Sequence, residues 1–142
     1  MLLPDETNWL NIKIAIWKAM GVKLNAPAKE EMIIKAQNEL SFQFPNDFKD
    51  FYKKANGFVE WDFIGSMFSI WSLEKIVREF KSSDDKSFIP FCDHSIDLYR
   101  IGYLNFEEGV FNDFNQEKPI AKTFEDTLRL IVKDSAILYG HN

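Results

Sequence analysis

The sequence is poor in the residues that build metal and redox centres. Its 142 residues include one cysteine, Cys92, and two histidines, His94 and His141. A lone cysteine cannot form an internal disulfide, so the composition is compatible with a reducing compartment. Cys92, Asp93, His94 and Asp97 bring several ligand types together, but no second cysteine or nearby histidine completes a zinc-binding set. We expect no bound metal and no cofactor.

Long apolar runs are also missing. No segment approaches the ~18 consecutive apolar residues that a membrane helix requires. A secretion signal has a basic stretch followed by an apolar run, and residues 1–6 contain no such basic stretch. We therefore expect a cytoplasmic protein that does not contact a membrane.

Positive charge is in deficit. The chain has 17 Lys and Arg against 22 Asp and Glu, which gives a net charge of −5. Proteins that bind nucleic acids need positive charge to meet the phosphates, so we expect no direct contact with nucleic acid. An acidic surface either serves solubility alone or attracts a basic partner and accelerates association with it. Both interpretations stay open on charge alone.

Catalytic motifs are absent as well. The sequence contains no glycine-rich phosphate-binding loop, no dinucleotide fingerprint and no nucleophile elbow. Cys92 and His94 stand two residues apart, but no third residue is marked as the orienting partner of a nucleophilic pair. Adjacent acids are usually solvated, whereas a general acid needs a carboxyl group in an apolar pocket. We predict no catalytic residue. A small hydrolase with two buried carboxylates remains an alternative, ranked below two non-catalytic functions that are described at the end of this subsection.

The first half of the chain has helical periodicity. We predict a helix over residues 6–20, a second that begins near Pro27, and a third that Pro45 opens and that ends before Asn56 and Gly57. Their apolar stripes are, in order, Trp9, Ile12, Ile16 and Met20; Ile33, Ala36, Gln37 and Leu40; and Phe48, Phe51 and Tyr52.

The period changes at Phe58. Alternating aromatic and acidic residues predict a strand over residues 58–64, and further strands are predicted over 67–70, 88–93, 98–104 and 110–114. Residues 105–109 form the predicted turn between the last two. Helices are predicted over 73–80 and 123–138, capped by Ser72 and Thr123. Helices followed by strands indicate an α+β fold, an antiparallel β-sheet packed against helices in one domain over residues 1–142.

Acidic residues interleaved with aromatic ones form the most suggestive feature. Aromatic anchors ringed by charge are typical of protein interfaces. The alternative is an amphipathic strand with Trp61 and Phe63 in the core and Glu60 and Asp62 outside, and the two interpretations are compatible. The predicted partner-binding residues are Glu60, Trp61, Asp62, Asp93, Asp97, Tyr99, Tyr103, Glu107, Glu108 and Asp113.

Residues 39–57, ELSFQFPNDFKDFYKKANG, resemble the signature of the SMI1/KNR4 family, also called the SUKH superfamily. That signature has a hydrophobic residue before proline, an acidic-aromatic pair, an aromatic residue three positions later and then Asn-Gly. Residues 88–101 are similar to the central strand pair of the family, with Asp97 at its acidic position, and residues 121–125 resemble the start of its last helix. The resemblance spans about residues 28–138. Residues 94–97 depart from the glycine-containing turn frequent in the family, and residues 1–25 are a candidate added N-terminal helix.

The resemblance implies an α+β fold and a non-catalytic role. Bacterial members of the family are chiefly immunity proteins of toxin systems, and fungal members are regulatory scaffolds of cell-wall synthesis. The short chain fits the bacterial type. We therefore expect a monomeric immunity protein that binds and neutralises a basic cognate toxin, for example a nuclease, with a general scaffold or regulatory interaction module as the alternative.

Overall fold

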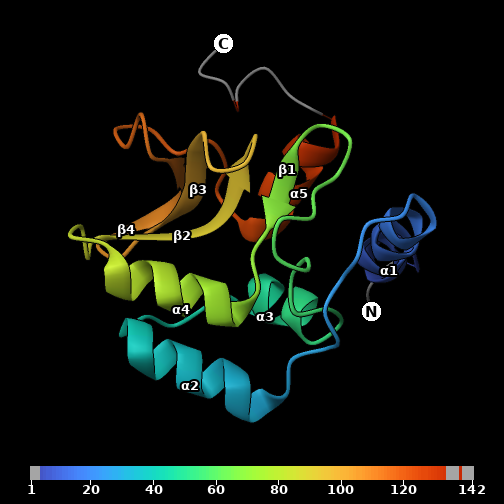
Figure 1. The fold of residues 1–142 in the computed structure, drawn as a ribbon, viewed down its shortest axis with the longest axis horizontal. Coiled ribbons are helices and arrows are strands. Elements are labelled where there is room, and N and C mark those ends of the chain that lie inside the picture. The colour runs from blue at the N-terminus through green and yellow to red at the C-terminus, as the bar shows by residue number, and fades with distance from the viewer. Residues whose placement is uncertain (1–3, 134–137, 139–142) are drawn as a thin grey trace.

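A computed structural model describes residues 4–133 and residue 138 of the chain (Figure 1). The helices are α1 (Pro4–Ala19), α2 (Glu30–Leu40), α3 (Asn46–Tyr52), α4 (Leu73–Ser82) and α5 (Phe124–Lys133). The strands are β1 (Phe68–Ile70), β2 (Phe88–His94), β3 (Tyr99–Leu104) and β4 (Glu107–Asn112). This arrangement confirms the predicted α+β fold.

The four strands form one antiparallel sheet in the order β1-β2-β3-β4. Strands β2 and β3 form the central hairpin, in which Phe88 pairs with Leu104 at one end and His94 with Tyr99 at the other. Helix α4 packs on β2, and α2 packs on α4, so these two helices form successive layers on one face of the sheet (Figure 1). Helix α1 lies at the side of this body.

The core is aromatic, as the composition indicates. The rings of Phe44, Phe48 and Tyr52 stack in succession, with centroid distances of 4.1 and 4.3 Å. Phe91 of β2 and Phe124 of α5 meet the edge of Phe48. The apolar stripes predicted for the second and third helices are buried, so those two predictions are confirmed.

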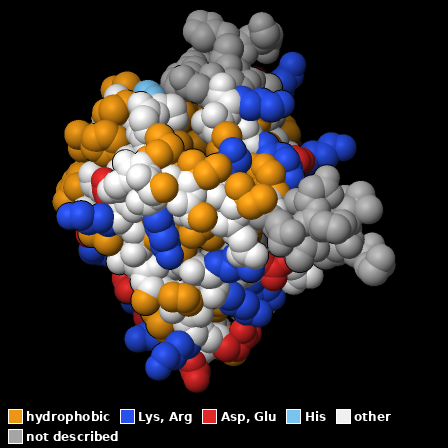
Figure 2. Space-filling view, turned by 90° about the vertical axis from the view of Figure 1, so that its right-hand side faces the viewer, with side chains coloured by type: hydrophobic (Ala, Val, Ile, Leu, Met, Phe, Trp, Pro, Cys, Tyr) orange, Lys and Arg blue, Asp and Glu red, His pale blue; other side chains and the backbone are white. Residues whose placement is uncertain are grey.

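Helix α1 confirms the predicted helix, but the predicted buried face is wrong. Ile12, Ile16 and Met20 are exposed, whereas Ile14 and Trp17 are buried. The edge-on contact between Trp17 and Phe58, at 5.4 Å, fixes which face turns inward. The sequence carries two competing apolar stripes on this helix, and helical periodicity alone does not rank them. Figure 2 shows hydrophobic side chains across the side of the molecule on which α1 lies.

The predicted strand over residues 58–64 is also wrong. Phe58 and Ile64 do hydrogen-bond to the outer edge of β1, through Phe58 N to Ile70 O and Ile64 N to Phe68 O. Between them the chain turns, and the amide of Asp62 donates to the carbonyl of Val59 at 2.9 Å. The Asp62 carboxylate accepts from the backbone N–H of Lys23, a contact distant in sequence that stabilises this turn.

Smaller differences lie in the second half. Strand β4 covers Glu107–Asn112 in place of the predicted 110–114, and Gly109 lies inside it with a φ of 115°. The ladder irregularity between Tyr103 and Leu104 accommodates this shift. The predicted caps are confirmed, because Ser72 accepts from Lys75 N and Thr123 from Asp126 N. Most of the predicted end of the last helix, and His141, lie outside the described residues.

Candidate protein-binding surface

The loop after α3 is fixed by two residues. The side-chain oxygen of Asn56 accepts from the backbone N–H of Leu73 at 2.9 Å, and its amide nitrogen donates to Glu74 at 2.8 Å. Gly57 has a φ of 67°, and a Cβ placed there would lie 2.3 Å from the carbonyl oxygen of Trp71. Only glycine permits this close approach, so the loop is held against the start of α4.

Trp61 lies at the tip of the turn that this loop makes. Its φ is 73° and its side chain is 62% exposed. The ring lies over the ammonium of Lys75, with Nζ 4.8 Å from the ring centroid. Lys75 is only 8% exposed, and on another side it lies 4.8 Å from the ring of Trp71. An exposed indole is thus held against a buried cation by cation–π attraction.

The buried ammonium of Lys75 has carboxylate partners. Its Nζ lies 3.9 Å from Asp93 and 4.0 Å from Glu60. Asp93 is itself buried, and it accepts hydrogen bonds from the Trp71 indole N–H and from the amide of Asp97. Buried charges are tolerated when they are paired in this way. Asp93 therefore links Lys75, Trp71 and the amide of Asp97 beneath the exposed indole.

The turn between β2 and β3 is strained. Ser95, Ile96 and Asp97 have φ values of 55°, 56° and 70°, a region that a β-branched residue such as Ile96 rarely occupies. Each such residue costs about 1–3 kcal/mol and persists only where its surroundings impose it. Here Ser95 N donates to Met67 O, and Asp97 N donates to Asp93. The turn presents Ile96 to solvent at 59% exposure.

These two turns meet. Trp61, Phe63 and Ile96 line a shallow hollow, which we call the Trp61 surface. Its floor is formed by Lys75 and by the cross-strand partners Ser69 and Asp93, all three of which are buried. Exposed apolar side chains therefore form the rim of the hollow, and buried polar side chains form its floor.

Ion pairs surround the Trp61 surface. Arg78 contacts Glu60 at 2.6 Å. Arg100 donates two hydrogen bonds to Asp97, at 2.7 and 2.9 Å, and a third to Glu79. The hydrogen bonds from Arg100 lower the pKa of Asp97. Three of the acids predicted to attract a partner, Glu60, Asp93 and Asp97, are therefore neutralised within the chain.

Comparison with known proteins identifies the family of this chain. The model of the SMI1 / KNR4 family (SUKH-1) matches residues 27–130. The chain belongs to this family. The matched residues include the whole Trp61 surface and leave α1 outside. No curated protein sequence matches the chain.

The remaining predicted site residues of this SMI1/KNR4 domain lie elsewhere. Tyr99 and Tyr103 are buried in the sheet, so neither presents the exposed ring of an interface anchor. Glu107 and Glu108 are exposed on β4, beyond the far end of the β2–β3 hairpin from Trp61. Asp113 is exposed, and its amide donates to the carbonyl of Arg100.

Sequence reasoning missed Ile96, Lys75 and the two arginines. Ile96 had a usable signal, because an apolar residue inside a predicted turn is a candidate for exposure. The Asp97–Arg100 spacing of three residues was a second signal for an ion pair. Lys75 offered none, because its partners Trp61 and Asp93 are distant in sequence.

No group of three or more His, Cys, Asp or Glu side chains in the described part of the chain is arranged to hold a metal ion. None of the described helices is long and apolar enough to cross a membrane.

Proposed function

We propose that this SMI1/KNR4 domain is a non-catalytic protein-binding domain, and that it serves as a cytoplasmic immunity protein that binds and neutralises a cognate bacterial toxin. The observation that carries the proposal is the Trp61 surface. A tryptophan that is 62% exposed stands beside two further exposed apolar side chains, Phe63 and Ile96. Large exposed apolar groups that lie together are typical of interaction sites.

The surface has the physical properties of a binding hot spot. Tryptophan is among the residues that contribute most to interface affinity, and such anchors are usually surrounded by polar groups that exclude water. Here Lys75 holds the Trp61 ring in place, and the Glu60–Arg78 and Asp97–Arg100 pairs surround it. Because these groups are ordered before binding, less conformational entropy is lost on association.

The strained turns support the same interpretation. Trp61, Ile96 and Asp97 all have positive φ values, and such strain clusters at functional sites. A hydrolytic role fits the hollow less well. Both oxygens of Asp93 accept hydrogen bonds, and the pKa of Asp97 is lowered, whereas a general acid requires a raised pKa.

We expect the partner to be basic, because the chain is acidic and several of its acids stay unpaired. The chain carries a net charge of −5. Asp62, Glu107, Glu108 and Asp113 form no ion pair with another described residue, so no Lys or Arg side chain in that part of the chain offsets their charge at ion-pair distance. These four acids therefore contribute to steering, and affinity depends mainly on the Trp61 surface.

Co-expression with the product of the neighbouring gene tests the proposal. We expect that product to be toxic alone, to be tolerated when the domain is present, and to co-purify with it. A neighbouring product that is neither toxic nor bound would favour the general scaffold or regulatory module.

A further inference from the structure

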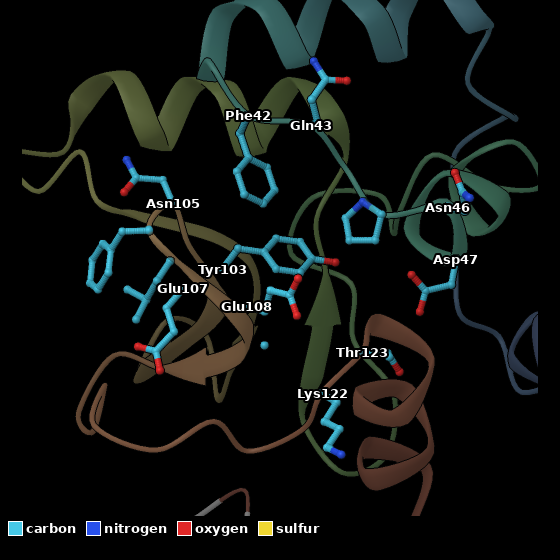
Figure 3. Close-up of a pocket in the computed structure, with 14 residues that line it drawn as sticks. Phe42, Gln43, Asn46, Asp47, Tyr103, Asn105, Glu107, Glu108, Lys122 and Thr123 are labelled. Atoms are coloured by element: carbon cyan, nitrogen blue, oxygen red, sulfur yellow. The ribbon is translucent and has the colours of Figure 1, made fainter.

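A second hollow lies at the opposite end of the β2–β3 hairpin. It is a pocket of about 640 Å³ beneath the β3–β4 turn (Figure 3). Its lining comes from residues 42–43, 45–47, 103–109 and 122–123. Its volume lies within the ~300–1,000 Å³ typical of ligand sites. The strand β2 separates it from the Trp61 surface by about 20 Å, at roughly 3.3 Å per residue.

The walls of this pocket are aromatic. Phe42 and Tyr103 lie with their ring centroids 5.2 Å apart. Phe106, at the tip of the turn, is 70% exposed and also lines the pocket. Aromatic faces attract cations through their quadrupole and provide an apolar surface for a hydrocarbon stem.

Oxygen acceptors are concentrated beside these rings. The carboxylates of Asp47, Glu107 and Glu108 line the pocket and outnumber its one ammonium, that of Lys122. Figure 3 shows Glu108 turned toward Tyr103, whereas the ammonium of Lys122 points away from it. Both oxygens of Asp47 already accept backbone N–H groups, from Phe48 and Glu125, so its position is fixed.

The hydroxyl of Tyr103 gives an independent indication. Tyr103 is 4% exposed, and its hydroxyl oxygen has no hydrogen-bond partner among the described residues. Figure 3 shows the hydroxyl pointing toward the side of the pocket on which Asp47 lies. A buried hydroxyl without a partner is unusual, and a ligand N–H would satisfy its oxygen after a small adjustment of the side chain.

We propose that this pocket binds a guanidinium or ammonium group at the end of a basic side chain that a protein partner presents. The hydrocarbon stem packs on Phe42 and Phe106, and the cationic head meets Glu108 and the Tyr103 oxygen. The inference rests on the proposed function, because it takes the partner to be a basic protein. It assigns to that partner a second contact, distinct from the Trp61 surface.

A small probe tests this assignment without the partner. N-acetyl-arginine amide is titrated into the isotope-labelled domain, and backbone amide shifts are followed by NMR. We expect saturable changes at Gln43 and Phe106 with millimolar affinity, because one charged side chain offers few contacts. The uncharged isostere N-acetyl-citrulline amide is expected to bind at least about tenfold more weakly.

Variants locate the binding. Glu108→Gln and Phe106→Ala are each expected to weaken arginine binding several-fold. Glu117→Gln removes the same charge from an exposed residue outside the pocket lining and is expected to leave binding unchanged. Because Glu108 and Phe106 are exposed, these variants retain the fold.

Two results would overturn the inference. One is a response to the citrulline probe equal to that of the arginine probe, or no saturable shift with either. The other is partner binding that Glu108→Gln leaves unchanged while the arginine probe still requires Glu108, which would assign the pocket to a free organic cation. Neither result bears on the proposed function, because co-expression with the neighbouring gene tests that function separately.

Discussion

The indole ring of Trp61 lies over the ammonium of Lys75, with 4.8 Å between the nitrogen and the ring centroid. Trp61 belongs to a surface turn, whereas Lys75 is a buried residue in the first turn of α4. The contact therefore attaches an exposed aromatic side chain to the core. Because Lys75 also lies over Trp71 and beside Asp93, its own position is fixed.

Removal of the indole tests the surface directly. Trp61→Ala is expected to weaken partner binding by about 2 kcal/mol or more, roughly 30-fold, because a hot-spot aromatic is lost. Isothermal titration calorimetry of the purified complex measures this change. Met20→Ala truncates another exposed apolar side chain, just after the end of α1, and serves as the control. Equal small losses in both variants would show that Trp61 is not an anchor.

The buried cation is expected to be essential for stability. Lys75→Met leaves Asp93 buried without its ammonium, so we expect a loss of about 3 kcal/mol in the free energy of unfolding. Lys81→Met removes the exposed pair with Glu39, and the loss there is expected to stay below about 1 kcal/mol. Urea denaturation of the two variants and the parent gives both values. Similar losses in the two variants would mean that the Lys75 network contributes no more than a surface ion pair.

The glycine that fixes the loop gives a backbone test. Gly57→Ala places a methyl group against the Trp71 carbonyl at a positive φ, so we expect destabilisation of about 2–3 kcal/mol. Gly65→Ala is the matched control, since a Cβ there meets no atom within 4 Å. Thermal unfolding of both variants should separate them clearly. A nearly unchanged melting temperature in Gly57→Ala would contradict the close approach.

The Asp97–Arg100 pair predicts a pH dependence. Hydrogen bonds from Arg100 lower the pKa of Asp97 in the folded state, so the folded state favours the ionised carboxylate. The resulting stability is present above the unfolded pKa, about 3.9, and is lost as pH falls through the folded value. The difference in unfolding free energy between the parent and Asp97→Asn should therefore be largest near neutral pH and shrink below about pH 4.

A series of urea titrations across this pH range measures that difference. Asp84→Asn removes a carboxylate from the exposed loop before β2 and controls for the general loss of acidic charge. A gap between parent and Asp97→Asn that stays constant with pH would show that Arg100 does not stabilise the ionised form.

Local signals predicted most of the helices because their stabilising contacts are local. Ser72 and Thr123 cap the helices that follow them, and both bonds span three residues. The apolar stripe of α2 matched its buried face because that helix has one dominant stripe. Helix α1 has two, and the choice between them depends on Phe58, which is far away in sequence.

The candidate site was harder to predict because its geometry depends on distant contacts. The alternation over residues 58–64 favours a strand, but the bond between Lys23 and Asp62 stabilises a turn there. That turn exposes Trp61, which a regular strand could have buried. Acidic residues were identified by type, yet Glu60 is paired with Arg78 on α4, and only the fold brings those two together.

Growth rescue tests the central claim most directly. Cells that express the neighbouring gene are compared with and without this SMI1/KNR4 domain, in its parent and Trp61→Ala forms, at matched levels of soluble protein. We predict that the parent domain restores growth and that Trp61→Ala restores it less well, because the toxin is then bound at least about 30-fold more weakly. Equal rescue by both forms would contradict the assignment of the Trp61 surface, and no toxicity or rescue at all would contradict the immunity function itself.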